Sequence, residues 1–341
     1  MVHTAHMQNA KPEFGPGVYA ARLVRSTMKD ADRLLDQAME AGYSRIAGTG
    51  IAILDPWMRD HPHAKFIYGE IFAENANVTE RLLRNCSDLA EGLALALDAN
   101  GSVLTSLYVL QRALGETVMR ICYMFDAAVA PARTMARLAA YQIESVEGNL
   151  RAAEAFGRAG KESARRTLSH IDMLHKMMKE GGFELHPDTR RPPLTFSVSI
   201  DGERENIKFD ATAAFKKYVP ASAWQWELGS GVTHSRGWML ASILPTLETE
   251  ALGSTVDSLM GIALTVFELA DALAVTAVAH TGVDADWFLK NIHGRRRGAL
   301  SWTESHDDLA VGHVEYANRP ANFIAKKGHP GTGFYRRGTS I

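Results

Sequence analysis

Apolar residues recur at every third or fourth position through most of the chain, and this spacing predicts a succession of helices. Two kinds of boundary support the assignment: Pro131 suits a first helical turn, and Gly181-Gly182 suits a helix end. The stretch 44–66, with its glycines and prolines, is expected to be a connection. The predicted helices cover residues 17–41, 65–77, 79–98, 101–126, 130–158, 161–180, 211–218, 222–227, 247–281 and 284–292, with another starting near Thr233.

The period changes to two in the run LTFSVSIDGERENIKFD, which begins at residue 194. Apolar and polar residues alternate there on either side of Asp201-Gly202, a pair typical of a two-residue hairpin turn. Because an isolated hairpin is marginal in water, we expect it to pack on the helices. The predicted fold is therefore mainly α, a multi-helix bundle with one inserted β-hairpin at about 194–210, centred on the 247–281 helix packed against 101–126.

The two ends of the chain lack this periodicity. Residues 1–15 are expected to be disordered. Residues 301–341, which include the Gly-rich run KKGHPGTGFYRRGTSI, are expected to form an irregular tail or a strap that orders against the body or a partner. Residues 16–300 are expected to form a single helical domain that carries the hairpin insertion at 182–210.

The composition and net charge of the chain limit the kinds of partner that we expect. A net charge of −2 over 341 residues implies no general attraction to nucleic acid or to an anionic membrane. Cys86 and Cys122 lack a Cys-x-x-Cys partner, which suits a reducing, cytoplasmic location. The apolar stretch 259–280 is long enough to span a bilayer, but Glu268 and Asp271 interrupt it, so we expect a buried helix and no membrane partner. Broad apolar helix faces also lead us to expect a homodimer.

Arg112, Glu116 and Arg120 recur every fourth residue in RALGETVMRICYMFD, a run that otherwise has the composition of a core helix. One interpretation is a solvated face, on which Glu116 bridges the two arginines for a few tenths of a kcal/mol each. The other is a buried, fully paired network or an anion-binding pocket, because apolar and aromatic residues share this side of the helix: Val109, Met119, Cys122 and Tyr123. The sequence leaves both interpretations open.

One carboxylate, Asp271, lies on an apolar arc of the 247–281 helix. Its neighbours on that arc are Met260, Leu264, Phe267, Val275 and Val278. An unpaired carboxylate there would be costly, so we expect an Arg or His partner or a raised pKa of the Asp271 carboxyl. A structural ion pair and a functional carboxylate both satisfy that expectation.

The run ELGSGVTHSRGW, residues 227–238, has the composition of a turn that precedes a helix. Gly229-Ser230-Gly231 is expected to break the chain before a helix that starts near Thr233. A helix N-terminus after such a turn offers free N–H groups to an anion, and Arg236 adds positive charge. His234 would then be placed to act as a general base. The alternative is a capped helix start that carries an ordinary histidine.

The runs RALGETVMRICYMFD and GSGVTHSRGW together resemble a pattern of all-helical actinobacterial proteins with no assigned activity. In those proteins an Arg-x3-Glu-x3-Arg helix is followed much later by a Ser/Thr-x-His motif. The resemblance covers about 30 residues and brings no known chemistry. It implies that Arg112, Glu116, Arg120 and His234 belong to one shared polar site.

These observations favour a small-molecule enzyme or binder with a polar, anion-accepting pocket inside the helical bundle. No cofactor motif is present, and the spacing of the His, Asp and Glu residues is not typical of a metal site, so neither a cofactor nor a metal is expected. The residues expected at the pocket are Arg112, Arg120, Arg236 and Tyr123 for substrate binding, and His234, Glu116 and Asp271 for catalysis.

Two other functions remain open. In a helical interaction or regulatory protein, the charge ladder formed by Arg112, Glu116 and Arg120 would have a structural role, and the C-terminal tail would bind a partner. A helical ribonuclease of the HEPN class would use Arg165 and His170, which have the Arg-x4-His spacing, although the net charge argues against nucleic acid as a partner. Convergence of the polar residues on a cavity distinguishes the small-molecule site from the interaction protein.

Overall fold

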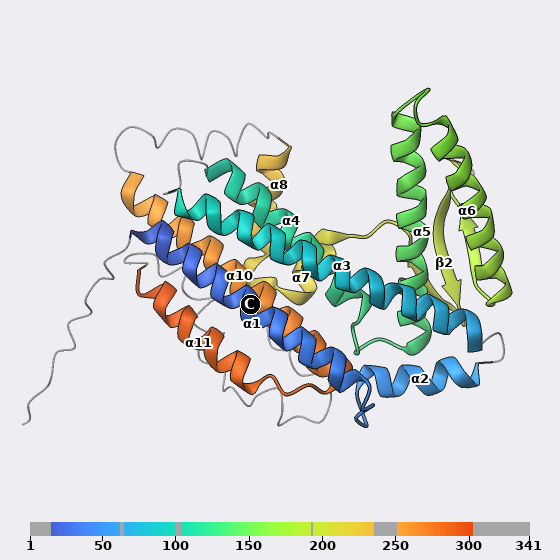
Figure 1. The fold of residues 1–341 in the computed structure, drawn as a ribbon, viewed down its shortest axis with the longest axis horizontal. Helices are drawn as coiled ribbons and strands as arrows, with labels where there is room; N and C mark the ends of the chain where they lie inside the picture. The colour runs from blue at the N-terminus through green and yellow to red at the C-terminus, as the bar shows by residue number, and fades with distance from the viewer. Residues whose placement is uncertain (1–14, 62–64, 100–103, 192–193, 235–250, 303–341) are drawn as a thin grey trace, which may run out of the picture.

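The structure, a computed structural model, describes residues 15–61, 65–99, 104–191, 194–234 and 251–302 of the 341-residue chain. Within these ranges the chain forms ten α-helices and a small three-stranded antiparallel sheet, so the prediction of a mainly α fold is confirmed. The elements divide into two lobes, which lie side by side in Figure 1. We call them the bundle lobe and the sheet lobe.

The bundle lobe is built around one long apolar helix, α10. Its helices are α1 (Pro16–Gly42), α3 (Lys65–Asp98), α4 (Leu104–Met124), α7 (Ala211–Tyr218), α8 (Ala223–Thr233), α10 (Ala251–Thr281) and α11 (Asp286–Leu300). α10 packs against α1, α4 and α11, and α1 also packs against α3. α7 and α8, joined by the short 3-10 helix Pro220–Ser222, cover α4. In Figure 1, α1 crosses in front of α10.

The sheet lobe projects from one end of the bundle lobe (Figure 1). Its elements are α2 (Gly50–Asp60), α5 (Pro131–Ala155), α6 (Lys161–Glu180), β1 (Glu184–Pro187), β2 (Thr195–Ile200) and β3 (Glu203–Asn206). α5 packs against α6, and the sheet rests on α5 through β2 and β3 and on α6 through β1. α2 lies at the base of the lobe, where it contacts α3, α5 and α10.

The predicted hairpin is confirmed, because β2 and β3 pair antiparallel across Asp201-Gly202. Both turn residues have positive φ, 49° and 79°, as a tight two-residue hairpin turn requires. The sheet also contains a third strand that the sequence did not predict: β1 pairs with β2, with Leu185 opposite Val198. β1 has only four residues, too few to establish an alternating pattern.

The two lobes have separate hydrophobic cores, and α3 contributes to both. Near its start, α3 places Tyr68 and Ile71 in the core of the sheet lobe, and near its end it places Leu93 and Leu97 in the core of the bundle lobe. All four side chains are fully buried. α3 is one helix of 34 residues where the sequence predicted two. A continuous helix therefore joins the lobes.

Among the described residues, one helical segment, Ser258–Thr281 of α10, is long and apolar enough to cross a bilayer. Of the most apolar 18 residues of this segment, 72% are buried against the rest of the protein. This burial supports the interpretation of α10 as a core helix. The predicted helix start at residue 247, the predicted disorder of residues 1–14 and the predicted tail from residue 303 onward lie outside the described residues.

The prediction of a connection over residues 44–66 is wrong for its central part, which forms α2. Ile51, Leu54 and Met58 are buried and recur at helical spacing, so they form one apolar stripe. Packing of that stripe outweighs the hydrogen bond that Pro56 cannot donate inside the helix. The glycines and the proline had suggested a loop, and tertiary packing overrides them.

The prediction of a chain break at Gly229-Ser230-Gly231 is also wrong, because these residues lie inside α8. α8 ends at Thr233 and has His234 as its C-cap. Gly229 serves close packing here: a Cβ atom at this position would lie 3.1 Å from the Cβ of Arg112 and 3.1 Å from the main-chain oxygen of Tyr108. His234 thus lies at the end of a helix where the free groups are carbonyls, which do not attract an anion.

Candidate functional site

A cavity of about 320 Å³ lies where α1, α3, α10 and the end of α4 in the bundle lobe meet α2 of the sheet lobe. Small-molecule sites in proteins have volumes of about 300–1,000 Å³, so this cavity is of that size. Most of its wall is apolar, and the apolar side chains include Leu35, Leu83, Ile121, Phe125, Leu273 and Ala277.

The rim of the cavity carries exposed side chains from the end of α1 and the segment after it. Met39 is 51% exposed and Tyr43 is 82% exposed, and both line the cavity. Arg45 lies at the same rim, where Asp55 holds its guanidinium with Nε–Oδ2 and Nη2–Oδ1 distances of 3.0 and 3.1 Å. The cavity therefore opens to solvent through an apolar rim, next to an arginine that already has a partner.

His280, in the last turn of α10, is the one buried polar side chain among those that line this cavity in the described residues; it is 9% exposed. Its ring stacks on Phe72 with centroids 6.5 Å apart and meets the Phe125 ring at 5.1 Å. Burial lowers the pKa of His280 to about 4, so the imidazole is neutral at neutral pH. Neither ring nitrogen forms a hydrogen bond with any residue that the structure describes.

The same histidine lines a second cavity of about 30 Å³, together with Gly50, Asp126 and Thr134. Nδ1 is the nitrogen on the Gly50 side, since a Cβ atom at Gly50 would lie 2.7 Å from it. A polar cavity above about 10–15 Å³ has room for one water molecule. His280 therefore lies between a large apolar cavity and a water-sized one with a mixed polar and apolar lining.

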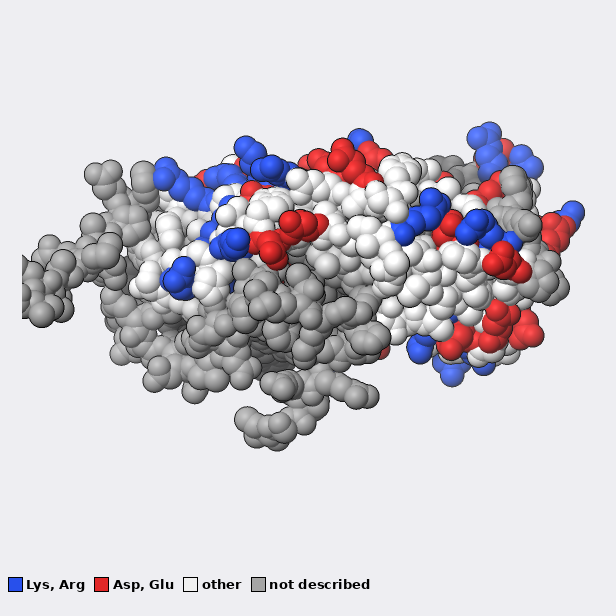
Figure 2. Space-filling view, turned by 90° about the horizontal axis from the view of Figure 1, so that it is seen from below, with Lys and Arg blue, Asp and Glu red and all other residues white. Residues whose placement is uncertain are grey.

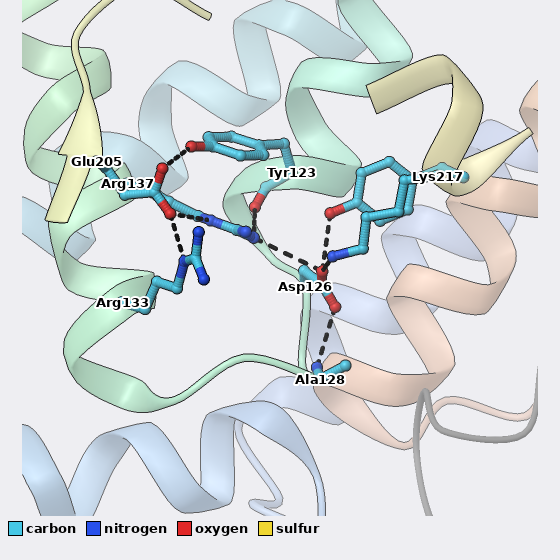
Figure 3. A network of polar contacts seen from close by, with 8 residues as sticks. Tyr123, Asp126, Ala128, Arg133, Arg137, Glu205 and Lys217 are labelled. Carbon is cyan, nitrogen blue, oxygen red and sulfur yellow. Dashed lines mark hydrogen bonds and ion pairs between the residues drawn. The ribbon is translucent and has the colours of Figure 1, made fainter. Parts of the chain in front are cut away.

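A network of paired polar side chains lies at the junction of the two lobes (Figure 3). Glu205 of β3 accepts hydrogen bonds from Arg133 Nε at 2.6 Å, Arg137 Nε at 3.2 Å and the Tyr123 hydroxyl at 2.5 Å. Burial alone would raise the pKa of Glu205, but these hydrogen bonds and the charge of Arg137 outweigh burial and lower it. Glu205 is therefore ionised and paired at neutral pH.

Asp126, just after α4, is the second carboxylate of this junction network. Its Oδ2 accepts hydrogen bonds from Lys217 Nζ at 2.5 Å and from the Tyr218 hydroxyl at 2.8 Å. Burial opposes ionisation, but Lys217 and Tyr218 lower the pKa of Asp126 below its usual value. Arg137 Nη1 lies 3.6 Å from the same oxygen, so Arg137 bridges Asp126 and Glu205. Figure 3 shows Arg137 between the two carboxylates.

The junction network is a structural clamp, because its charged groups are paired with one another and hold α4, α5, β3 and α7 together. Its partners lie 68 and 92 residues apart in the pairs Arg137–Glu205 and Tyr218–Asp126. No local pattern connects residues at such separations, and the sequence pointed only to Tyr123. The hydroxyl of that residue, which was predicted to bind substrate, donates to Glu205.

The charge ladder on α4 is half-buried. This is intermediate between the two interpretations, a solvated helix face and a buried network or pocket. Arg120 forms an ion pair with Glu144 of α5, and its guanidinium carbon lies 4.8 Å from the centroid of the Phe209 ring. Glu116 lies 3.9 Å from Arg120, and its side chain is 41% exposed. Arg120 therefore joins α4 to α5.

Arg112, at the other end of the ladder, lies against α8. Its guanidinium carbon is 4.7 Å from the centroid of the Trp226 ring, and its Nη1 is buried with no hydrogen bond to the described residues. Gln111, Ser222 and Gln225 also have buried side-chain atoms with no hydrogen bond to the described part of the chain. α8 packs on α4 and the short 3-10 helix before it packs on α10, so these buried atoms, which have no hydrogen bond within the described ranges, lie in one region.

Asp271 has the arginine partner that the sequence predicted. Its Oδ2 accepts a hydrogen bond from Arg296 Nη2 of α11 at 2.6 Å. Arg296 is 2% exposed and also lies 3.8 Å from Glu268. Asp271 and Arg296 thus form an ion pair that joins α10 to α11.

The predicted pocket residues are distributed over several interfaces. Arg120 contacts α5, Asp271 contacts α11, and Tyr123 belongs to the junction network. His234 is the exposed C-cap of α8, and Arg236 lies outside the described residues. The residue that faces the large cavity, His280, was not predicted, because in the sequence it is only one more residue at the end of an apolar helix.

Within the described ranges, no three His, Cys, Asp or Glu side chains lie close enough together to hold a metal ion. Comparison of the chain with protein-family models, curated proteins and solved structures gives no match. Function is therefore inferred from the geometry of the chain itself.

Proposed function

We propose that the protein binds a small, largely apolar molecule in the 320 Å³ cavity beside His280. The observation that carries this proposal is a neutral imidazole, only 9% exposed, that lines an apolar cavity and has no hydrogen bond to the residues that the structure describes. A buried polar group left without a partner costs about 1–3 kcal/mol. A ligand that fills the cavity removes apolar surface from water and also supplies the missing hydrogen bond.

The proposal keeps the predicted class of site, a small-molecule pocket inside the helical bundle, and moves it from the α4 ladder to the cavity beside His280. The surface charge agrees with a small ligand. On the face seen in Figure 2, the described Lys and Arg side chains are interspersed with Asp and Glu. A nucleic-acid partner would favour a continuous basic stripe instead.

The proposed activity is binding. A general base works best when its pKa lies near the working pH. The pKa of His280, about 4, is well below neutrality, so this side chain is better suited to a neutral hydrogen bond than to proton transfer.

The test uses Nile red, a neutral dye whose fluorescence rises in apolar surroundings, and two variants of one helix. Ala76 and Ala73 are both exposed on α3, but only Ala76 lines the cavity. We expect the wild type and the control Ala73→Trp to bind the dye with the same affinity. Ala76→Trp places an indole in the cavity and should weaken binding at least about tenfold. No binding by the wild type, or equal binding by Ala76→Trp, would overturn the proposal.

A second candidate, anion binding beside Arg112, keeps part of the predicted anion-accepting pocket. It is favoured by the buried Nη1 of Arg112, which has no hydrogen bond to the described residues. A guanidinium N–H left unpaired in the interior is more costly than a neutral group, and an anionic group of a ligand would satisfy it.

This second candidate is tested by calorimetric titration with inorganic phosphate. Arg112→Gln should abolish phosphate binding, and the control Arg166→Gln, on the exposed side of α6, should leave it unchanged. Loss of binding in both variants, or in neither, would contradict a specific role for Arg112.

A further inference from the structure

The structure points to the class of ligand that this cavity takes. We infer that the ligand is a neutral molecule with an apolar body and a hydrogen-bond-donating group, such as a long-chain alcohol or a phenol. This inference rests on the proposed function. It follows from the donors and acceptors that the described side chains of the cavity wall offer, considered one by one.

Three threonines line the cavity: Thr79 of α3, and Thr276 and Thr281 of α10. Each hydroxyl donates its hydrogen to the carbonyl oxygen four residues earlier in its own helix, at 2.7, 2.8 and 2.8 Å, respectively. A hydroxyl has a single hydrogen to donate. The three oxygens can therefore offer only lone pairs to a ligand, and Thr281 Oγ1 already accepts one hydrogen bond, from the main-chain N–H of Val283 at 3.4 Å.

His280 adds no positive charge to this wall. Its pKa of about 4 keeps the ring neutral at neutral pH, so it has one donor nitrogen and one acceptor nitrogen. Nδ1 lies on the side of the small cavity, which Asp126 also lines. The ionised carboxylate of Asp126 only accepts hydrogen bonds. A water in that cavity that donates to Asp126 and accepts from Nδ1–H leaves the other nitrogen, Nε2, as an acceptor toward the ligand.

The charged groups at the rim do not favour an anionic ligand. Arg45 is held by Asp55 through two contacts at 3.0 and 3.1 Å. Glu80 also lines the cavity and carries a negative charge beside the opening, in an ion pair with Arg84. A carboxylate ligand would lose its hydration and meet acceptor oxygens and a neutral imidazole. A ketone or an ether would also bring only lone pairs to these acceptor atoms, and the one hydroxyl donor among the described lining residues, Tyr43, belongs to a side chain that is 82% exposed at the rim.

An alcohol differs in the one respect that matters here, because its O–H can donate to a threonine oxygen or to Nε2. A net hydrogen bond of this kind is worth about tenfold in affinity. The apolar chain would occupy the rest of the cavity, between Leu83, Ile121 and Leu273.

The experiment compares n-decanol with its isomer methyl nonyl ether and with decanoate, each displacing Nile red from the full-length protein. The alcohol should bind about tenfold more tightly than the ether, and decanoate more weakly than the alcohol. Because the ether is the more apolar isomer, partitioning without a specific hydrogen bond would favour the ether. If the dye binds and the ether or decanoate competes as well as the alcohol, the inference about ligand class is overturned and the proposed function stands. Absence of dye binding would overturn the proposed function itself.

A double variant, Thr276→Val with Thr281→Val, provides the second arm of the test. It removes two acceptor oxygens and keeps the side-chain shape, so the preference for the alcohol should fall. The control is Thr167→Val on α6, where the hydroxyl makes the same bond to a carbonyl four residues earlier, at 2.9 Å, but does not line the cavity. An undiminished preference in the double variant would overturn the role of the threonines.

Discussion

Arg137 of α5 and Glu205 of β3 form a buried ion pair, Nε to Oε1 at 3.2 Å, across the junction of the two lobes. Their side chains are only 5% and 9% exposed. Arg137 also reaches Asp126, so one guanidinium balances two carboxylates that come from different parts of the chain. Together with α3, which runs through both lobes, this arginine connects the sheet lobe to the bundle lobe.

Replacing Arg137 by Ala should lower the free energy of unfolding by about 3–5 kcal/mol, because buried carboxylates would lose a cation. Arg133 contacts the same oxygen of Glu205, but its side chain is 44% exposed. Arg133→Ala should therefore cost about 1 kcal/mol or less. Urea unfolding followed by circular dichroism measures both values. Equal losses in the two variants would contradict the role of Arg137 as the clamp.

The pH dependence of stability should reveal the burial of His280. Its folded pKa of about 4 lies below the value of about 6.5 for an exposed histidine. As the pH falls below about 6.5, the unfolded chain takes up a proton that the folded chain does not, so folding loses stability until about pH 4, in total on the order of 3 kcal/mol.

The His280→Gln variant lacks this titration, and its free energy of unfolding should vary less between pH 7 and 4 than that of the wild type. Other groups, such as Asp126 and Glu205, titrate in both proteins and cancel in the comparison. Parallel pH curves for the two proteins would show that His280 is not buried as described.

Gly50 should not tolerate a methyl group. A Cβ atom there would lie 2.7 Å from His280 Nδ1 and 3.0 Å from the Cβ of Ala127, so Gly50→Ala should destabilise the protein by about 1–3 kcal/mol. Gly69, inside α3, has open space at the same position, and Gly69→Ala should stabilise by up to about 1 kcal/mol. Thermal unfolding midpoints should move in opposite directions. A shift of the same sign in both variants would argue against the tight contact at Gly50.

The ion pair between Asp271 and Arg296 should matter far more than a surface pair of similar geometry. Asp271→Ala leaves Arg296 buried without its nearest carboxylate, and the expected loss is about 3–5 kcal/mol. Glu162 forms ion pairs with Arg165 and Arg166 on the exposed face of α6, where Glu162→Ala should change stability by about 0.5 kcal/mol or less. Chemical denaturation of both variants decides whether the α10–α11 pair has this importance.

Much of the fold was predictable because helix periodicity is local. The spacing of apolar residues located α1, α5 and α6 to within a few residues, and Asp201-Gly202 located the hairpin. The failures occurred where a residue's role depends on a distant neighbour. Gly229 permits α8 to approach Arg112, and from the sequence alone a glycine that permits close packing looks the same as one that makes a turn.

The candidate site was harder to predict than the fold. The requirement for a partner at Asp271 followed from its position on an apolar arc, and Arg296 supplies that partner. The cavity beside His280 depends instead on how far apart α1, α3 and α10 lie, and no periodicity encodes that spacing. The sequence therefore suggested a site at the regularly spaced charged residues and gave no signal for His280, a single polar residue at the end of an apolar helix with no hydrogen bond to the described residues.

α3 forms a rod that passes from one lobe into the other. Its 34 residues extend over about 50 Å at the usual rise of a helix. Tyr68 and Ile71 anchor it in the sheet lobe, and the turns that follow provide one wall of the cavity through Phe72, Ala76, Thr79 and Leu83. A change in the angle between the lobes would therefore displace that wall of the cavity. By the reciprocity of linked equilibria, a compound that binds one position of the wall more tightly would also favour the corresponding angle of the sheet lobe.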